Sequence, residues 1–288
     1  MPHQDRWLED VYRQLSLHIF QIRKDIRQPG YDTGWRSLPA TLIEMPIGGQ
    51  WMLHLKGRSQ PIEVRDYEVM VIPSGTFHRL QNRGSAPMKT CFLFGAFSCM
   101  SYLDLFHIFR VPTTLPREAG VKLAPLISTM DRLFMRPQTS IEDLSKVHEL
   151  AFRALGIILQ YRHQAEHDLP KTELERIGKV LDLIHQNPEI EQTCEALAAK
   201  TNLSASWFRT VFKKATGFAP KIYQRNLRLK QSITLLISTP LPINQIADQC
   251  RFHSPYYFTR YFTKHVGSSP SQFRKNFSKS DPLRVVSN

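Results

Sequence analysis

Two twenty-residue segments near the C-terminal end of the chain share one pattern of residues, fifty positions apart. The first is SASWFRTVFKKATGFAPKIY, residues 204–223, and the second is SPYYFTRYFTKHVGSSPSQF, residues 254–273. The identical pairs are Ser204/Ser254, Phe208/Phe258, Phe212/Phe262, Lys214/Lys264, Gly217/Gly267 and Pro220/Pro270. No gap is needed to align them. A spacing this regular predicts one supersecondary unit that the chain uses twice.

Each copy is predicted to form a helix with defined ends. The serine can accept a hydrogen bond from a free N–H group of the first turn, apolar residues follow at i and i+4, and a glycine ends the helix. A shorter apolar helix precedes each copy, CEALAAKT at residues 194–201 and INQIADQC at residues 243–250. A short helix, a turn and a capped second helix make up the helix-turn-helix pattern.

The phenylalanines of the repeat are predicted to face a core, which leaves polar side chains on the opposite face of each second helix. These are Ser206, Arg209, Thr210 and Lys213 in the first copy, and Tyr256, Thr259, Arg260 and Thr263 in the second. Side chains of this kind can reach base edges and phosphates.

Net charge is distributed unevenly along the chain. Residues 171–288 contain 18 Lys and Arg against 8 Asp and Glu, whereas residues 1–170 contain 20 against 17. The positive field therefore belongs to the repeat-containing part, and it favours a polyanion as partner. A generic basic surface or attraction to a membrane surface is the alternative, although no helix combines a basic face with an exposed Trp/Phe/Leu face.

Residues 174–277 resemble the DNA-binding domain of the AraC/XylS transcription regulators. The resemblance lies in residues 197–236 and, most specifically, in residues 243–275. It implies seven helices: a leading helix near 174–187, two helix-turn-helix units, a connecting helix near 221–238 and a closing turn near 270–276. It also implies that the second helices of the two units enter adjacent major grooves of double-stranded DNA, and that the protein contacts RNA polymerase.

The base-contacting positions of the family fall here on Ser206, Arg209, Thr210, Pro255, Tyr256, Thr259 and Arg260. Arg209 and Arg260 can each form a bidentate contact to guanine or hold a phosphate, and both options stay open. The predicted DNA-binding set also includes Lys213, Arg251 and Lys264. Arg251 stands where the family usually has glycine, and a positive φ there would cost on the order of 1 kcal/mol.

The two copies differ at most of their predicted DNA-facing positions, so they should recognise different sequences. The connecting helix would be a rod of about 27 Å at a rise of 1.5 Å per residue. This approaches the ~34 Å between equivalent major-groove faces. One chain is therefore expected to recognise an asymmetric site across two adjacent major grooves.

The first 165 residues have a different character. From residue 40 to 97, short β-branched and aromatic runs are broken by Gly, Pro, Ser and Asn, which predicts a small antiparallel barrel or sandwich. We therefore expect an α+β chain. Its sensor and dimerisation domain spans 1–165, with a cupin-like antiparallel β-barrel at about 30–115 and helices at about 120–164. A linker at 166–173 and an all-α DNA-binding domain at 174–288 follow.

The segment PSGTFHRLQN, residues 73–82, resembles the second motif of cupin barrels through Pro73, Gly75, His78 and Asn82. Such barrels commonly form the sensor half of AraC-like regulators. In metal-binding cupins His78 would be a ligand beside an H-x-H motif, but the matching region offers His54 alone. Two histidines are fewer ligands than metal sites usually have, so no metal and no cofactor is predicted.

A pocket for a small-molecule effector is the predicted use of the barrel. The candidates lie on or beside predicted strands and combine flat apolar surface with polar groups; they are Trp35, Arg36, Trp51, His54 and His78. For each of them a core or rim position is the alternative. A sugar, an aromatic acid, a polyamine and a lipid all remain open as effectors.

The segment at residues 122–164 has apolar residues at helical spacing. This stripe can pack on the barrel or pair two protomers, and the resemblance implies a homodimer. No apolar run reaches the length of a membrane span, and the first ten residues lack the apolar core of a signal peptide. The cysteines show no C-x-x-C spacing, which suits reduced thiols in a bacterial cytoplasm, where the protein would associate with the nucleoid.

Three hypotheses about function follow. The first is a DNA-binding transcription regulator of the AraC/XylS type, an activator or a repressor, whose barrel binds an effector. In the second, the N-terminal half serves only dimerisation or protein partners. The third is a metal-dependent cupin enzyme with a DNA-binding appendage. Because the sequence contains no Walker loop, no G-x-S-x-G and no H-E-x-x-H, we predict that the protein is not an enzyme.

Overall fold

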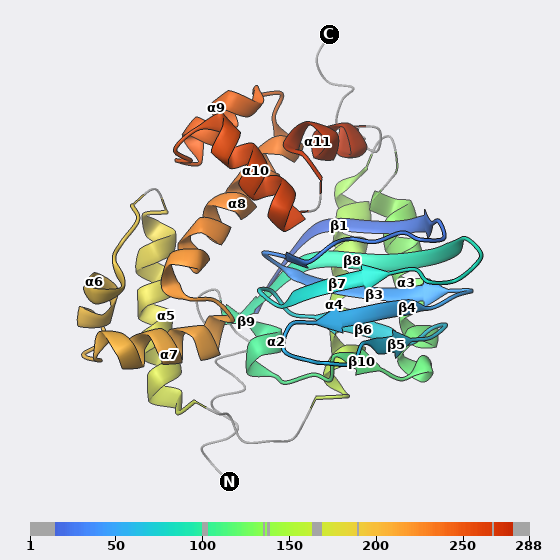
Figure 1. Ribbon diagram of the computed structural model, residues 1–288, viewed down its shortest axis with the longest axis horizontal. Coiled ribbons are helices and arrows are strands. Elements are labelled where there is room, and N and C mark those ends of the chain that lie inside the picture. The colour runs from blue at the N-terminus through green and yellow to red at the C-terminus, as the bar shows by residue number, and fades with distance from the viewer. Residues whose placement is uncertain are drawn as a thin grey trace.

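Two antiparallel sheets form the N-terminal part of the molecule, and helices form the C-terminal part (Figure 1). The computed structural model describes residues 15–99, 103–134, 136, 139–162, 169–188, 190–266 and 268–278. The α+β organisation predicted from the sequence is confirmed.

The larger sheet has the strand order β1-β8-β3-β6-β10, with β9 paired to β8, and the smaller sheet has the order β2-β7-β4-β5. The strands are β1 Ser16–Arg27, β2 Arg36–Ser37, β3 Thr41–Ile47, β4 Trp51–Leu55, β5 Ile62–Val64, β6 Val69–Ile72, β7 Phe77–Gln81, β8 Met88–Cys99, β9 Leu103–Asp104 and β10 Thr114–Leu115.

The two sheets face each other without closing into a barrel within the described residues. Strands β2 and β10, at two of the edges, contain 2 residues each. Such short edges offer too few backbone groups to continue a ladder. Instead, Asn82 Nδ2 donates to the carbonyls of Arg27 and Gln28, 3.0 and 3.1 Å away, so a side chain joins the end of β7 to the end of β1. The predicted barrel is therefore an open, two-sheet structure.

Strand β1 lies upstream of the region in which the sequence predicted strands. It pairs with β8 along its length, with an irregularity between Ile19 and Gln21. This bulge changes which side of the strand faces inward, so its buried residues, Leu17 and Ile22, are an odd number of positions apart. The alternation that identifies a strand is therefore lost in the sequence.

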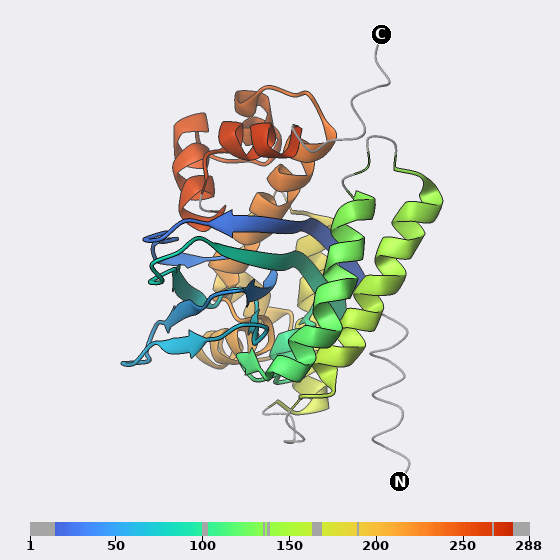
Figure 2. The ribbon, with the colours of Figure 1, turned by 90° about the vertical axis from the view of Figure 1, so that its right-hand side faces the viewer.

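Three helices accompany the sheets: α2 Leu105–Ile108, α3 Arg117–Phe134 and α4 Ile141–Leu159. Helix α3 packs against β1 and β8 of the larger sheet, and α4 packs against α3 (Figure 2). Helix α4 begins with a capping box, because the Ser140 hydroxyl accepts from the Asp143 N–H and the Asp143 carboxylate accepts from the Ser140 N–H. The inner stripes of both helices join the core of the larger sheet.

The C-terminal part contains the helices that the resemblance implies, with a short helix in place of the closing turn. They are α5 Lys171–Gln186, α6 Cys194–Ala199, α7 Ala205–Thr216, α8 Pro220–Ser238, α9 Ile243–Gln249, α10 Pro255–Val266 and α11 Pro270–Ser278. Residues 166–168 of the expected linker lie outside the described residues, and 171–173 begin α5. No helix of the described chain is long and apolar enough to span a membrane.

The repeated residues form equivalent ends and faces in the two units. The hydroxyls of Ser204 and Ser254 accept from backbone N–H groups three residues later, at 3.2 and 3.1 Å. Gly217 ends α7 with a φ of 79°, which glycine adopts without steric cost. Its counterpart Gly267 lies outside the described residues. Because Phe208, Phe212, Phe258 and Phe262 are all fully buried, the predicted inner face of each unit is confirmed.

Candidate nucleic-acid interface and effector cavity

The outer faces of α7 and α10 carry the side chains for which the sequence predicted DNA contacts. In α7, Ser206, Arg209, Thr210 and Lys213 are exposed. In α10, Tyr256, Arg260 and Lys264 are exposed and Thr259 is half-buried. Within the described part of the chain, Arg209 makes no hydrogen bond or ion pair. Its guanidinium is therefore available to an external partner.

The second unit presents a different surface from the first. Tyr256 is 72% exposed, and the Arg260 guanidinium lies 5.8 Å from the centre of its ring. A cation above an aromatic face is attracted by the ring quadrupole. This contact can orient Arg260 before any partner binds.

Arg251 lies in the turn between α9 and α10 and has a φ of 55°. Arg251 therefore adopts the left-handed backbone conformation for which the family usually has glycine. Its side chain is exposed, whereas its backbone carbonyl accepts from the buried Arg228 at 3.5 Å. The exposed side chain thus belongs to the turn that precedes α10.

Helix α8 connects the two units, which lie near its opposite ends (Figure 1). Its 19 residues give a length of roughly 28 Å at 1.5 Å per residue. Arg228, near its middle, contacts both units. It donates to the Pro188 carbonyl at 3.2 Å, pairs with Glu191 at 3.3 Å and reaches the Arg251 carbonyl. The single side chain of Arg228 thus connects α8 to both units.

Both units also contact the β domain through the C-terminal ends of α7 and α10. Gly217 lies against His107 of α2, whose Nε2 is 2.7 Å from the Ser74 carbonyl. His265, in the last turn of α10, places Nδ1 3.1 Å from the carbonyl of Ser37 on β2. The positions of α7 and α10 are therefore coupled to the β domain.

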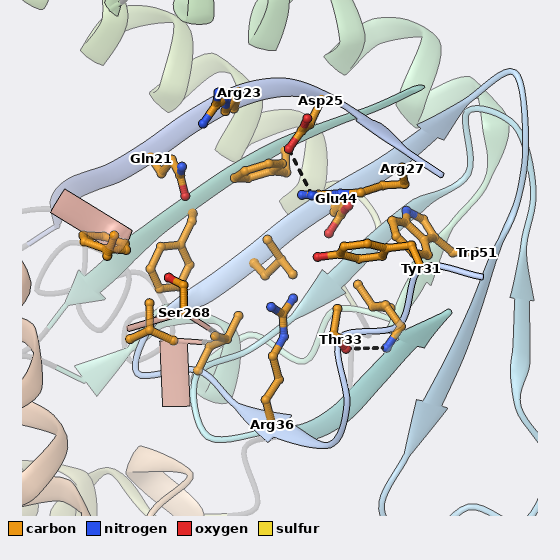
Figure 3. Close-up of a pocket in the computed structure, with 17 residues that line it drawn as sticks. Gln21, Arg23, Asp25, Arg27, Tyr31, Thr33, Arg36, Glu44, Trp51 and Ser268 are labelled. Atoms are coloured by element: carbon orange, nitrogen blue, oxygen red, sulfur yellow. Dashed lines mark hydrogen bonds and ion pairs between the residues drawn. The ribbon is translucent and has the colours of Figure 1, made fainter. Parts of the chain in front are cut away.

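A cavity of about 200 Å³ lies between the two sheets (Figure 3). Charged and polar residues line one part of it and aromatic residues another, and residues of the helical domain contribute to its wall. The lining residues are Gln21, Arg23, Asp25, Arg27, Tyr31, Thr33, Arg36, Leu38, Leu42, Glu44, Trp51, Leu80, Phe92 and Phe94, with Val266, Ser268 and Phe273 of the DNA-binding domain.

Arg36 reaches into this cavity from β2, opposite His78 of β7. Its Nε donates to His78 Nε2 at 3.4 Å, while His78 Nδ1 lies 2.9 Å from the Thr76 carbonyl. Burial and the nearby Arg36 charge lower the pKa of His78 to about 4. Burial also lowers the pKa of the Arg36 guanidinium. His78 is therefore neutral at pH 7 and supports Arg36 through its unprotonated nitrogen.

Glu44 lies on the larger sheet across the cavity from Arg36, and it is 4% exposed. Burial raises the pKa of its carboxyl. The Thr90 hydroxyl donates to Glu44 Oε1 at 2.9 Å, and Trp51 Nε1 lies 3.4 Å from the same hydroxyl oxygen. Trp51 thus contributes to the cavity wall and to a buried polar network.

The five predicted ligand residues occupy different faces of the smaller sheet. Arg36 and Trp51 line the cavity. His78 supports Arg36 from the inner face. Trp35 and His54 lie on the outer face, because His54 pairs with Arg79 whereas Leu55 pairs with His78, and neighbouring side chains alternate. There, Trp35 stacks on Phe77 with ring centroids 5.6 Å apart.

The same alternation separates the two histidines of the cupin-like pattern. His78 points inward and His54 outward, where His54 Nε2 lies 2.8 Å from Gln81 Oε1. One metal ion could not be held by both. Among the described residues, no group of three or more His, Cys, Asp or Glu side chains is placed to hold a metal ion.

Sequence reasoning missed the cavity residues of β1 and Glu44 of β3. Arg27 pairs with Asp25 at 3.0 Å, and its guanidinium lies 4.6 Å from the centre of the Tyr31 ring. The missed signal was the presence of charged residues between apolar ones in residues 16–27. In a strand whose inner side faces a cavity, such charges mark a polar wall.

A second cavity, of about 300 Å³, lies between the β domain and α8. Its lining includes Lys230 of α8, Asp104 of the β domain and the aromatic side chains of Phe20 and Phe97. Burial lowers the pKa of Lys230, and the Asp104 carboxylate opposes that shift. The domain junction therefore also has room for a small molecule.

Comparison with known proteins agrees with this architecture. A family model described as a helix-turn-helix domain matches residues 197–276. The transcriptional activator RhaR of Salmonella arizonae is 30% identical over 138 residues, which are 48% of this chain and 49% of RhaR. RhaR of Salmonella newport matches equally well. The chain thus spans about half the length of the curated relatives it matches.

The whole fold resembles that of ToxT from Vibrio cholerae. One ToxT crystal structure matches 91% of this chain and 98% of its own, with a TM-score of 0.57 and 12% sequence identity. A structure of ToxT bound to an unsaturated fatty acid matches 91% of this chain and 95% of its own, with a TM-score of 0.58 and 16% identity. The C-terminal part of the chain is thus similar to the helix-turn-helix domains of transcriptional activators such as RhaR, and the two-domain fold is similar to that of ToxT.

Proposed function

We propose that this chain is a sequence-specific DNA-binding transcription regulator controlled by a small-molecule effector in its N-terminal domain. The observation that carries the proposal is the pair of outward faces on α7 and α10. Identical buried phenylalanines support both helices, yet the exposed residues differ, with Arg209 on one and Tyr256 and Arg260 on the other. Such a pair suits two different DNA sequences.

Helix α8 suits a site that spans two adjacent major grooves. Its length of roughly 28 Å is close to the ~34 Å pitch of DNA, and Arg228 holds it to both units. We infer that one chain recognises an asymmetric double-stranded site, with Ser206, Thr210, Lys213, Thr259 and Lys264 as further contacts to bases or phosphates and Arg251 as a phosphate contact.

Control by an effector is supported by the two cavities, because both adjoin the DNA-binding domain. ToxT, which has a similar fold, binds an unsaturated fatty acid in one structure. A cavity whose wall includes residues of the second unit can transmit occupancy to α10 and α11. The action would take place on the bacterial nucleoid, in the cytoplasm, through contacts with RNA polymerase, and would involve no enzymatic step.

Pairing of two protomers is a further part of the proposal. Helix α4 exposes Ile141, Leu144 and Phe152, which are 72%, 37% and 41% exposed. Apolar side chains grouped on one helix mark a surface suited to a protein partner. A homodimer joined there would bring two asymmetric sites together on the DNA.

Replacing the exposed arginines tests the DNA interface. Arg209→Ala and Arg260→Ala should each weaken specific DNA binding by roughly 1–3 kcal/mol and relax the sequence preference if they contact bases. If they hold phosphates instead, affinity falls for all sequences and the salt dependence of binding decreases. Genome-wide mapping of occupied DNA supplies the site, and fluorescence anisotropy at several salt concentrations measures the affinity.

Lys122→Ala is the matched control, because Lys122 is an exposed cation on α3, outside the helical domain. Its affinity for DNA should equal that of the unchanged chain. The proposed interface is wrong if both arginine variants keep the affinity, the sequence preference and the salt dependence of the unchanged protein.

A further inference from the structure

The cavity between the sheets contains a cation with unused hydrogen-bond donors. Arg36 uses Nε for His78, and its two terminal nitrogens make no hydrogen bond or ion pair in the described part of the chain. Figure 3 shows its guanidinium directed into the cavity. Nε of Arg27, on the opposite sheet, is likewise buried without a partner among the described residues. A buried donor without a partner, such as Arg27 Nε, is costly unless a ligand or water satisfies it, and the terminal nitrogens of Arg36 are free to bind a ligand in the cavity.

Charge in the cavity favours an anion. The lining includes Arg23, Arg27 and Arg36 against Asp25 and Glu44, and Asp25 is already paired with Arg27. Arginine stays protonated in proteins, whereas burial raises the pKa of Glu44 and so disfavours its charged form. The planar guanidinium of Arg36 matches the two oxygens of a carboxylate.

The remaining walls and the size of the cavity indicate the polarity and the size of the rest of the ligand. Tyr31 and Trp51 pack edge to face with ring centroids 6.0 Å apart, and Phe92 and Phe94 continue the apolar wall. The volume of about 200 Å³ is below the ~300 Å³ at which pockets for drug-sized ligands begin. The volume of this space therefore favours a short apolar body.

We propose that the cavity binds a small carboxylate with an apolar body, its carboxylate on Arg36 and its body against Tyr31, Trp51 and Phe92. The identity of this site as the effector site rests on the proposed function. Val266 at the end of α10, Ser268 of the following loop and Phe273 of α11 also line the cavity. A ligand that fills the cavity therefore contacts α10, α11 and the loop between them.

Matched pairs of acids and amides test the ligand class on the full chain. The probes are benzoate with benzamide, phenylacetate with phenylacetamide, and hexanoate with hexanamide, each titrated at pH 7 while the melting temperature is followed. At least one acid should raise the melting temperature, and its amide should not. Arg36→Gln should weaken the affinity for that acid about tenfold or more, because a charge-assisted bidentate contact is lost.

Two further variants test whether the affinity for the acid depends on Arg36 and not on another cation. Arg58→Gln removes an exposed arginine beyond β4, and Lys230→Gln removes the lysine of the cavity at the domain junction. Neither should change the affinity for the acid. The proposal is overturned if no acid shifts the melting temperature, if acid and amide shift it equally, or if the shift is lost with Lys230→Gln rather than with Arg36→Gln. The comparison of acid with amide uses the unchanged chain, so it holds even if Arg36→Gln fails to fold.

DNA binding by the same preparations distinguishes the two proposals. If specific DNA binding persists while every acid fails to bind, the carboxylate site is wrong and the regulator stands. If an acid binds through Arg36 while no specific DNA site exists, the cavity stands and the proposed function fails.

Discussion

His78 occupies the position of a metal ligand in a cupin-like pattern, but its two ring nitrogens are both engaged within the protein. Nδ1 is bonded to the Thr76 carbonyl, and Nε2 accepts from Arg36. Only neutral imidazole can make both contacts, since a protonated ring has no acceptor. The side chain therefore orients Arg36 and sets the pH range in which the cavity keeps this arrangement.

Stability should depend on pH through this residue. The pKa of His78 is about 4 in the folded chain and near 6.5 when unfolded. The folded state binds fewer protons between these values, so stability is complete above about pH 6.5 and is lost as pH falls towards 4. The loss is on the order of 3 kcal/mol, since one pKa unit corresponds to ~1.4 kcal/mol. Denaturant unfolding between pH 4 and 7.5 measures it.

His78→Gln should remove part of this pH dependence, because glutamine can donate to Thr76 and accept from Arg36 without titrating. His54→Gln, on the outer face of the same sheet, is the control. The assignment to His78 fails if the two variants change the slope of stability against pH by the same amount. Burial lowers the pKa of His185 to about 3. His185 therefore also makes stability fall as pH falls, and it does so in both variants.

At the level of elements, α8 determines how the two helix-turn-helix units are placed. Its inner side contributes Leu229, Ile233 and Leu236 to the core of the second unit. Gln224 holds the loop before α6 by accepting from the Gln192 N–H at 2.8 Å and donating to its carbonyl at 3.0 Å. Because α8 is one continuous helix, these contacts transmit the position of one unit to the other.

Two cations of α8 that contact Glu191 should differ in their effect on stability. Arg228 is buried and also bonds to backbone carbonyls, whereas Lys221 is largely exposed and lies 3.6 Å from the same carboxylate. Arg228→Met should lower the free energy of unfolding by about 1.5–3 kcal/mol, the range for hydrogen bonds to charged groups. Lys221→Met should cost less than about 1 kcal/mol, as exposed ion pairs do. Urea unfolding compares them, and equal losses would refute the role given to Arg228.

Across the whole molecule, the β domain and the helical domain are joined at both α7 and α10. Phe218, just after α7, packs on Gly75 of the cupin-like segment, and His265 at the end of α10 contacts β2. Phe20 of β1 packs against both the core between the sheets and the core of the second unit. Any movement of the sheets would therefore act on both units at once.

A methyl group at Gly217 should disturb this junction. A Cβ there would lie 2.3 Å from His107 Nε2, and His107 is held by the Ser74 carbonyl. Gly57 has a similar positive φ but open space around it, so Gly57→Ala carries the backbone strain alone. Gly217→Ala should cost at least about 1 kcal/mol more than Gly57→Ala, as overpacking does. Thermal unfolding measures both.

The double variant Gly217→Ala/His107→Ala should recover part of that difference, because the obstructing ring is gone while the Ser74 carbonyl remains 3.0 Å from the added Cβ. If Gly217→Ala and Gly57→Ala destabilise the protein equally, or if the double variant recovers no stability, the contact between α7 and α2 does not help to hold the two domains together.

The repeat by itself determined the two helix-turn-helix units, down to their caps and buried phenylalanines. Those features depend on residues within one or two turns, so a local pattern suffices to predict them. The same holds for α8 between Pro220 and Ser238, and for the antiparallel strands between turns.

Only the tertiary structure decided which residues form the cavity. Strand β1 pairs with β8, and Arg36 meets His78, across long stretches of chain. A bulge in β1 hides its alternation, and adjacent residues such as Trp35 and Arg36 separate to opposite faces once their strand pairs. Strand register and long-range pairing are set by the packing of the whole domain, so no local pattern could place Arg36 opposite Glu44.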